Sequence, residues 1–402
     1  MKVCFITYGC KVNQAEALRW ESLLRFQGYI ITDNSAEADF WVINTCAVTQ
    51  KAEIQSKQII NKARKLNKKT LVTGCYVELY KPQQTENLKI ISNYKKDCLI
   101  NYFQPINKTN TSNISRHRAI VKIQEGCNQF CSYCIVPYLR GKPKSYPVKE
   151  ILHQIKDYEK MGIKEIVLSG VNLGLYGIGL EERVSLNSLI KTILKETSGF
   201  RMRLSSIEVN HINDEFLEII SDKRICGHLH IPLQHGSDRI LNLMNRPYTI
   251  REFIERIEKI LTHYPEISIG VDIIAGFPSE TEKDFRKTLQ LIENIGFSYL
   301  HAFTYSGRPF TKASELPEQI PENIKKERTN ILIEIGKNKK IDYIKKFINS
   351  ELEVIVENRK KNVFSGTSDN YIKCLIDNKE LVEGSLIKAF VIGMDGQYCL
   401  CK

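Results

Sequence analysis

The chain lacks any long apolar run, and 26% of its 402 residues are charged. A membrane-spanning helix needs about 20 consecutive apolar residues, so an integral membrane protein is excluded and no membrane partner is expected. We also expect no secretory leader, because Met1–Thr7 passes directly into a strand pattern without a cleavage site. In a leaderless chain, the twelve cysteines predict metal binding in a reducing compartment rather than disulfides. We therefore expect a cytoplasmic protein of two or three domains.

Acidic residues are scarce at the N-terminal end. Residues 1–150 contain 11 Asp and Glu against 23 Lys and Arg, and the rest of the chain carries no net charge. This imbalance favours an anionic partner, most simply nucleic acid, although charge that serves only solubility is the alternative. We expect Arg64, Lys65, Lys68 and Lys69 to carry much of the phosphate contact.

Three cysteines, Cys127, Cys131 and Cys134, stand within eight residues in the spacing C-x3-C-x2-C. Three thiolates on one loop can hold three corners of a 4Fe-4S cluster, which normally takes four cysteine ligands, so one iron would stay open. Tetrahedral zinc would need a fourth ligand nearby, and His117, ten residues upstream, lacks finger-like spacing. Buried, unreactive cysteines are the other alternative. The spacing favours an iron–sulfur site.

With Tyr133 before its last cysteine, the motif resembles the signature of radical S-adenosylmethionine (SAM) enzymes. The resemblance implies that SAM chelates the open iron through its amino and carboxylate groups, and that one electron from the cluster cleaves SAM to a 5′-deoxyadenosyl radical. Tyr133 then belongs to the cofactor-binding residues. An electron donor such as flavodoxin or ferredoxin is an expected partner.

Three further cysteines each follow a predicted strand near the N-terminus. The strands are expected at 2–7, 40–43 and 71–73. Helices between them, one of them over about 51–67, predict a parallel sheet with right-handed crossovers. Strand ends of a parallel sheet share one edge, where ligands bind, so Cys10, Cys46 and Cys75 should converge. Each alone would be an ordinary buried residue, but together they predict a second three-cysteine cluster site.

The strand–helix alternation resumes after a polar segment. Strands are predicted at 119–124, 165–169, 203–208, 228–233, 269–274 and 298–304, and helices at 148–161, 186–197, 213–221, 249–263 and 280–295. Six β/α units predict an open partial (β/α)6 barrel. After a basic helix at about 321–347, short strands at 352–357, 371–376, 386–393 and 397–401 predict a small β-barrel, with Gly366 in a turn.

The predicted fold class is therefore α/β, with three domains. An N-terminal parallel-sheet α/β domain covers 1–102, a linker covers 103–117, the partial barrel covers 118–347 and the small β-barrel covers 348–402. The other cysteines show no convergent partners and are interpreted as packing or surface residues, although the last two of them alternate on one strand and would matter only as a pair. They are Cys4, Cys98, Cys226, Cys374, Cys399 and Cys401.

Polar residues and glycines follow the barrel strands, where β/α barrels bind their ligands. Glycine allows close backbone approach, and an amide side chain can bind the methionine end of SAM. A structural cap is the alternative for each residue, and only their recurrence at strand ends favours SAM contacts. The candidate SAM-binding residues are Tyr133, Gly170, Asn172, Glu208, Gln234, Asp272 and Gly276.

Motifs along the whole chain resemble those of the methylthiotransferase family. They are Tyr8–Gln14 (YGCKVNQ), Asn44–Cys46, Gly74–Tyr76, Gly126–Gly141, Leu204–Glu208 (LSSIE), Pro232–Ser237 (PLQHGS) and Tyr305–Pro309 (YSGRP). The resemblance implies that Cys10, Cys46 and Cys75 hold an auxiliary 4Fe-4S cluster that delivers sulfur, so that all six motif cysteines are catalytic and metal-binding. It also implies that the C-terminal β-domain is an RNA-contacting TRAM domain.

Lys11–Gln14 is most similar to the branch that acts on tRNA carrying N6-threonylcarbamoyladenosine beside the anticodon, where it adds a methylthio group at carbon 2. The implied partner is the tRNA anticodon stem-loop, and a monomer is expected. A base reaches such a site only when it is splayed out of its loop. We expect Arg140, Lys142 and Lys144 to receive the threonylcarbamoyl carboxylate, and little activity on isopentenyladenosine.

Two features depart from the family pattern. The β-domain has 7 Lys and Arg against 8 Asp and Glu, a weak electrostatic grip for tRNA, and Gly307 stands where proline is expected. Three alternatives stay open: an enzyme for isopentenyladenosine tRNA, an enzyme for a ribosomal protein, and a non-catalytic iron–sulfur RNA-binding protein. The second would normally show proline where Lys11 stands, and the third does not need Gly170, Gln234 and Gly276 at strand ends.

Overall fold

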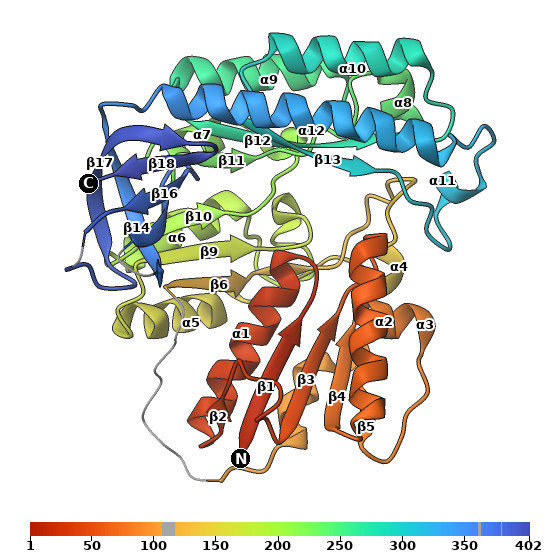
Figure 1. The fold of residues 1–402 in the computed structure, drawn as a ribbon, viewed down its shortest axis with the longest axis vertical. Coiled ribbons are helices and arrows are strands. Elements are labelled where there is room, and N and C mark those ends of the chain that lie inside the picture. The colour runs from red at the N-terminus through yellow and green to blue at the C-terminus, as the bar shows by residue number, and fades with distance from the viewer. Residues whose placement is uncertain (107–116, 361–362, 379) are drawn as a thin grey trace.

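A five-stranded parallel sheet organises the N-terminal part of the chain (Figure 1). The structure, a computed structural model, describes residues 1–106, 117–360, 363–378 and 380–402. The strand order β2-β1-β3-β4-β5 confirms the predicted parallel arrangement, whereas β2 and β5 were not predicted. The strands are β1 (Lys2–Thr7), β2 (Ile30–Ile31), β3 (Phe40–Thr45), β4 (Lys69–Gly74) and β5 (Leu88–Ile90).

Helices cover both faces of this sheet. Successive side chains of a strand point to opposite faces, so Val42 packs with Trp20 on one side and Trp41 packs with Ile60 on the other. All four side chains are buried. The first face is covered by α1 and η1, and the second by α2. The helices are α1 (Lys11–Phe26), α2 (Gln50–Lys65), α3 (Cys75–Tyr80) and the 3-10 helix η1 (Asn93–Tyr102).

The central domain is an open barrel made of two three-stranded parallel sheets, β6-β9-β10 and β11-β12-β13. The strands are β6 (Arg118–Lys122), β9 (Glu165–Ser169), β10 (Arg201–Leu204), β11 (His228–His230), β12 (Ser268–Ala275) and β13 (Tyr299–Thr304). A single parallel bridge between Met202 and Ile225 joins the two sheets. Among the described residues, no strand pairing joins β13 back to β6, so the predicted partial barrel is confirmed.

Helices surround the outside of this barrel and bury a large aliphatic core against its strands. They are α5 (Val148–Lys160), α6 (Leu186–Glu196), α7 (Asp214–Ile220), α8 (Asp238–Leu243), α9 (Ile250–His263) and α10 (Glu282–Asn294). Shorter elements at the strand ends are β7 (Gln124–Glu125), α4 (Val136–Arg140), β8 (Lys144–Ser145), η2 (Leu173–Leu175), η3 (Val209–His211) and α11 (Lys312–Glu315). Among the described residues, no helix has both the length and the apolar content needed to cross a membrane.

The C-terminal part is a closed five-stranded barrel in the order β14-β15-β16-β18-β17. The long helix α12 (Glu322–Lys345) packs against β13 and leads into the C-terminal barrel. The strands are β14 (Glu351–Lys360), β15 (Val363–Ser368), β16 (Lys373–Ile376), β17 (Leu386–Asp395) and β18 (Tyr398–Cys401). One detail of the sequence interpretation is wrong. Gly366 lies inside β15, not in a turn. A side chain at this position would lie only 2.5 Å from Val354 of the neighbouring strand, so the close approach of β14 requires glycine.

The N-terminal part packs on the central barrel through α1, which lies along β6 (Figure 1). Most of the predicted linker, residues 107–116, falls outside the described residues, and the domain boundaries stay predictions. The packing of α1 along β6 brings the carboxyl ends of β1, β3 and β4 next to the central barrel. The candidate site is built at this junction.

Candidate functional site

The first cysteine set, Cys127, Cys131 and Cys134, lies on the loop between β7 and α4, just beyond β6. Gly126 starts the loop with φ of +72°, and a side chain there would collide with a backbone carbonyl. Ser132 fixes the loop to the end of α8, because its amide donates to the Met244 carbonyl at 3.0 Å and its hydroxyl to a neighbouring carbonyl at 2.7 Å. The three half-buried thiols therefore share one end of the barrel.

Burial makes these thiols poor acids unless a positive charge lies nearby. Burial raises the pKa of Cys134 to about 12, and it also raises the pKa of Cys131. The Arg246 guanidinium opposes this effect, since Nη1 donates to the Cys131 Sγ at 3.3 Å. Arg246 is itself held by an ion pair with Glu208 and by the hydroxyl of Tyr248, at 2.9 Å. Burial thus outweighs Arg246, and without metal both thiols keep their protons; a bound metal would displace these protons, because the thiolate is the form that binds metal.

The second cysteine set, Cys10, Cys46 and Cys75, converges as the strand pattern predicts. The three residues follow β1, β3 and β4, which are adjacent in the sheet. Gly9 has φ of +93°, and a side chain there would lie only 2.5 Å from the Cys46 Sγ, so glycine is needed for this approach. Asn13 ties the loops together, because its side-chain amide donates to the carbonyl of Tyr8, just after β1, at 2.8 Å and to that of Thr45, at the end of β3, at 3.0 Å.

Arg140 connects the second set to the loop of the first. Burial raises the pKa of the Cys75 thiol, and the Arg140 guanidinium acts against this through its charge and a hydrogen bond. The guanidinium also donates to Glu16 of α1 at 3.1 Å and to Glu125 of β7 at 2.9 Å. Since Arg140 ends the short helix that follows the first set, one ion-pair network fixes the two cysteine sets relative to each other.

Each set offers three thiols on one loop or on neighbouring loops, and three thiolates can hold three irons of a 4Fe-4S cluster. Among the described residues, the group of His, Cys, Asp and Glu whose ligand atoms all lie within 4.8 Å of one another is His230, Asp272 and His301. In each cysteine set, at least two sulfurs therefore lie farther apart than this.

Two candidate SAM-binding residues lie directly against the first set. The hydroxyl of Tyr133 lies 3.4 Å from Arg246 Nη1, and Glu208 makes its ion pair with the same guanidinium. Burial raises the pKa of Glu208, and Arg246 opposes that shift. Arg246 was missed from the sequence, because it follows α8, far from any strand end.

The backbone candidates surround the same end of the barrel. Gln234 has φ of +71°, and its backbone N–H donates to the Asp272 backbone carbonyl at 2.7 Å. Gly276 has φ of +74° and lies against Lys325 of α12, so a side chain there would collide. The backbone N–H of Asn172 donates to Oε1 of Gln124 at 2.9 Å.

Asn172 and Gly170 lie on the opposite side of the barrel from these two. The Asn172 side chain lies 3.5 Å from Gln129 on the loop of the first set. A side chain at Gly170 would lie 3.1 Å from Gln124. The structure thus gathers the candidates at one end of the barrel without testing what they bind.

Asp272 instead faces a polar interior deeper in the barrel. Its carboxylate lies 3.0 Å from His230 Nε2 and 3.3 Å from His301 Nδ1. Burial alone would raise the pKa of Asp272, but hydrogen bonds from the two histidines hold it well below its usual range. Lys11 faces the same interior, where burial and the charge of Arg203 lower its pKa to about 8.

Two sequence interpretations need correction. Arg140 is buried in the network described above, so it is not free to receive a substrate carboxylate, whereas Lys142 and Lys144 are exposed. Cys374 is not without partners: its pKa is raised by contacts with the thiols of Cys399 and Cys401 and by burial. These three cysteines converge inside the C-terminal barrel, a pairing that spacing on separate strands did not reveal.

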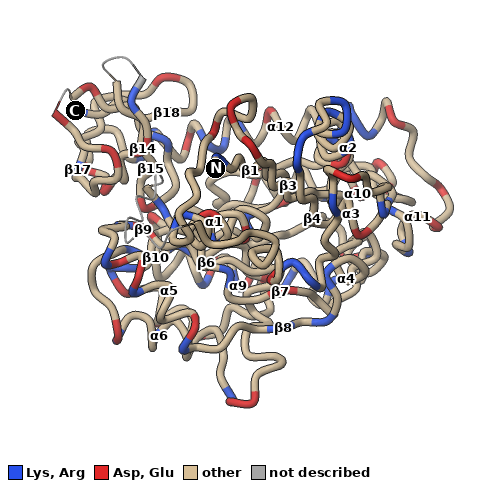
Figure 2. Tube along the Cα trace, turned by 90° about the horizontal axis from the view of Figure 1, so that it is seen from below, with Lys and Arg blue, Asp and Glu red and all other residues tan. Residues whose placement is uncertain are grey.

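The four basic residues at the end of α2, Arg64, Lys65, Lys68 and Lys69, are called the α2 basic end. Lys and Arg gather along α2 in Figure 2. The α2 basic end covers the last turn of this 16-residue helix and the start of β4. The N-terminus of α2 follows Cys46, so the basic end is roughly 24 Å from the second set.

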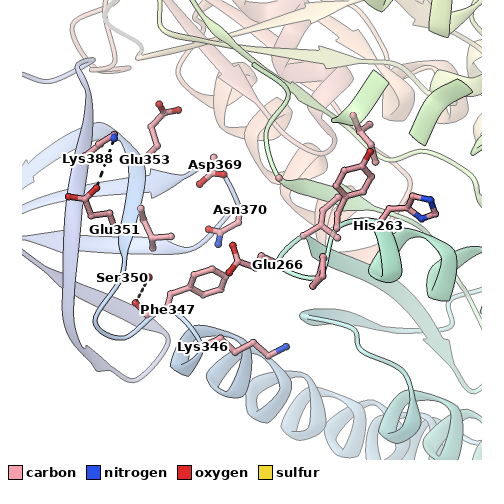
Figure 3. A pocket seen from close by; sticks show the side chains of 16 residues that line it. His263, Glu266, Lys346, Phe347, Ser350, Glu351, Glu353, Asp369, Asn370 and Lys388 are labelled. Atoms are coloured by element: carbon pink, nitrogen blue, oxygen red, sulfur yellow. Dashed lines mark hydrogen bonds and ion pairs between the residues drawn. The ribbon is translucent and has the colours of Figure 1, made fainter. Parts of the chain in front are cut away.

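A cavity of about 760 Å³ is not part of this site. It lies between α9, α12 and the C-terminal barrel, and its labelled side chains include Glu266, Glu353 and Asp369 (Figure 3). It contains no cysteine of either set. A smaller cavity, of about 360 Å³, is lined by residues of all three parts of the chain, including Lys11, Arg203 and Tyr371.

Comparisons with known proteins agree with this layout. Residues 121–292 match the radical SAM superfamily, and residues 2–94 match the uncharacterized protein family UPF0004. The threonylcarbamoyladenosine tRNA methylthiotransferase MtaB of Aquifex aeolicus is 37% identical over 388 residues, covering 89% of this chain and 94% of that protein. The MtaB of Bacillus subtilis is 35% identical, covering 97% and 93%.

A second branch is also similar. The tRNA-2-methylthio-N(6)-dimethylallyladenosine synthase of Clostridium novyi is 32% identical, covering 97% of this chain and 95% of that protein. Among solved structures, the radical S-adenosylmethionine methyltransferase TsrM from Kitasatospora setae has a TM-score of 0.56 at 11% identity, covering 78% of this chain and 75% of that chain. At this identity the likeness supports the fold alone.

Proposed function

Because the chain belongs to the radical SAM methylthiotransferase family, we propose that it inserts a methylthio group at carbon 2 of N6-threonylcarbamoyladenosine, beside the anticodon of tRNA. The observation that carries the proposal is the meeting of two cysteine sets from different domains, linked by Arg140. Sulfur insertion at an inert aromatic carbon needs both a strong oxidant of the C–H bond and a store of reactive sulfur, and acid–base chemistry supplies neither. Two separate metal centres facing one space meet both needs.

The first set would hold a 4Fe-4S cluster with one iron left for SAM, and a bound cluster supplies the electron that cleaves SAM. The residues of the chain hold and orient these groups. Arg246 offsets the negative charge of the Cys131 thiolate, and its pairing with Glu208 keeps the guanidinium in place. Gly276 and Gln234, both at positive φ, shape the backbone at the strand ends where we place SAM.

The second set would hold the auxiliary 4Fe-4S cluster, which supplies sulfur when bound. Gly9 permits the close approach of the cysteine loops, and Arg140 places a buried positive charge beside Cys75. The network around Arg140 also excludes water, because its side chain and that of Glu16 are each only 2% exposed. Low water access favours a radical at this junction reacting with the target base rather than with solvent.

An exposed aromatic patch beside the first set suits the anticodon loop. Phe130, Tyr138 and Phe310 are 48%, 41% and 65% exposed, yet their rings contact one another at centroid distances of 5.8 and 6.3 Å. Large exposed aromatic side chains of this kind stack unpaired bases. We propose that this patch holds bases next to the adenine that is splayed into the site.

The finer assignments follow from the same family membership. An electron donor such as flavodoxin or ferredoxin, a monomeric state and a cytoplasmic location are proposed. The candidate SAM contacts remain proposals too, and replacing Asn172 or Gln234 while measuring SAM binding would examine them.

Nucleoside mass spectrometry tests the function directly. Deletion of the gene should remove the methylthio group from threonylcarbamoyladenosine in tRNA, and the wild-type chain should restore it. A variant with all three cysteines of the first set changed to alanine serves as the matched control and should not restore it. Unchanged nucleosides in the deletion strain, or preferential methylthiolation of isopentenyladenosine by the purified protein, would overturn the proposal.

A further inference from the structure

Lys11 carries a positive charge that pairs directly with no acid of the described residues, and the charges of Glu165 and Asp272 act on it only from a distance. It is the first residue of α1, directly after Cys10, and its side chain enters the 360 Å³ cavity. Its Nζ lies 5.7 Å from the ring centroid of Tyr371. Within the described part of the chain, the Lys11 ammonium has no ion pair and no hydrogen bond. A half-buried ammonium without an acceptor is unfavourable, so its surroundings suit an anion that comes from outside.

Neighbouring cations differ from Lys11 in this respect. Arg203 donates to Glu165 at 2.9 Å, and Arg118 pairs with Glu165 and Glu357, so the acids of this region are already engaged. Among the described residues, nine buried cations each contact a glutamate: Lys96, Lys122, Arg140, Arg201, Arg203, Arg246, Arg308, Lys325 and Arg328. The chain therefore supplies acids to its buried cations as a rule, and it supplies none to Lys11.

The C-terminal barrel forms one wall of the cavity around Lys11, through Glu357, Asn358 and Tyr371, and the one acid among the lining residues, Glu357, pairs with Arg118. Tyr371, on the turn between β15 and β16, stacks on His228 with ring centroids 4.4 Å apart. The buried Nδ1 of His228 has no hydrogen-bond partner, and His301 lies nearby with Asp272. A cavity of this size lies within the range of about 300–1,000 Å³ that holds small ligands. Its lining suits a group with hydrogen-bonding atoms and one negative charge.

We infer that Lys11 binds the carboxylate of the N6-threonylcarbamoyl group and thereby determines which modified adenine the site accepts. The inference rests on the proposed function. Carbon 2 and carbon 6, which carries N6, both flank N1 of adenine, so when carbon 2 faces the second cysteine set, the N6 substituent begins on the same edge of the base as carbon 2, and Lys11 directly follows Cys10 of that set. A charge-assisted hydrogen bond would then fix it. An isopentenyl group would leave the ammonium buried without a partner, which disfavours that substrate.

The experiment compares two anticodon stem-loops, one with threonylcarbamoyladenosine and one in which its carboxylate is replaced by a carboxamide. The reconstituted wild type, Lys11→Met and Lys11→Arg are assayed for kcat/KM of methylthiolation, and for RNA binding without SAM by fluorescence anisotropy. Lys89→Met, at an exposed lysine of β5, is the matched control. Iron content is measured for each variant because Lys11 follows Cys10. The ratio of acid to amide substrate within one variant cancels any general loss of folding.

We expect the wild type and Lys89→Met to prefer the acid by about 10- to 100-fold, the size of a hydrogen bond to a charged group. Lys11→Met should reduce this preference to less than about threefold, by weakening the acid substrate alone, and Lys11→Arg should keep part of it. A Lys11→Met variant that keeps the wild-type preference overturns the inference and leaves the proposed function intact. A wild type that modifies neither RNA overturns the proposed function instead.

Discussion

Replacing Glu16 with glutamine should destabilise the junction between the N-terminal domain and the central barrel. The Glu16 carboxylate accepts hydrogen bonds from Lys96 at 2.7 Å, Lys122 at 3.0 Å and Arg140 at 3.1 Å. After the change, three buried cations would share only Glu125, since an amide carries no charge. Removing one partner of a buried ion pair costs about 3–5 kcal/mol, because the opposite charge stays desolvated. We expect a loss of unfolding free energy in this range.

The assay exploits the position of the two tryptophans. Trp20 and Trp41 are the only ones in the chain, and both lie in the core of the N-terminal domain at 3% and 1% exposure. Their fluorescence during urea unfolding of the metal-free chain therefore reports on this domain alone. The same substitution at Glu37, whose pair with Lys2 at 3.2 Å is exposed, should cost less than about 1 kcal/mol.

The pH dependence separates charge from packing. The charges of Lys122, Arg140 and Lys96 overcome the effect of burial and hold the pKa of Glu16 well below its usual range. The contribution of Glu16 is therefore fully present above its unfolded-state pKa of about 4.3, and it is lost as the pH falls toward the lower folded-state pKa. The difference between wild type and Glu16→Gln should shrink on acidification. A constant difference between pH 7 and pH 4 would refute the electrostatic reasoning.

Three further predictions concern metal and RNA. Anaerobic reconstitution should give roughly eight irons per chain, and changing either cysteine set to alanine should leave about four, by iron analysis; a full complement after either change would exclude two clusters. Neutralising the α2 basic end should flatten the salt dependence of tRNA affinity, measured as log Kd against log salt, and an unchanged slope would place the phosphate contacts elsewhere. Phe310→Ala should weaken anticodon stem-loop binding by about 1–3 kcal/mol without changing iron content, and equal binding would exclude stacking on the aromatic patch.

Strand–helix alternation made most of the fold predictable. The six predicted barrel strands and the convergence of the second set follow from one rule, that parallel strands joined by right-handed crossovers end at the same edge. The closed C-terminal barrel was expected from short alternating strands, but β15 was missed. Its sequence, VFSGTS, reads as a turn because of Gly366, whereas that glycine allows β14 to approach closely. Local pattern cannot distinguish these two uses of glycine.

The site was predictable in its ligands but not in its charges. The cysteines stand in motifs, so their spacing carries the information. The roles of Arg140 and Arg246 could not be predicted in this way, because each acts through a tertiary contact with an acid from another element, Glu16 or Glu208. For the same reason we expected Arg140 to bind the substrate, whereas its guanidinium is engaged in the ion-pair network that joins the two cysteine sets. The sequence could not reveal that Lys11 lacks an acidic partner among the described residues, because this requires the position of every acid around it.

The weak charge of the C-terminal barrel has a structural reason. Arg201 donates to the Thr367 carbonyl and Arg203 to the Ser368 carbonyl, both at 2.9 Å, so this barrel closes one end of the central one. Its acids serve the same contact, since Glu357 pairs with Arg118. A strongly basic barrel would repel these arginines, which argues that its composition is set by docking rather than by RNA affinity. The electrostatic attraction for tRNA must then come from the basic N-terminal half, and the C-terminal barrel contributes Tyr371 to the wall of the Lys11 cavity.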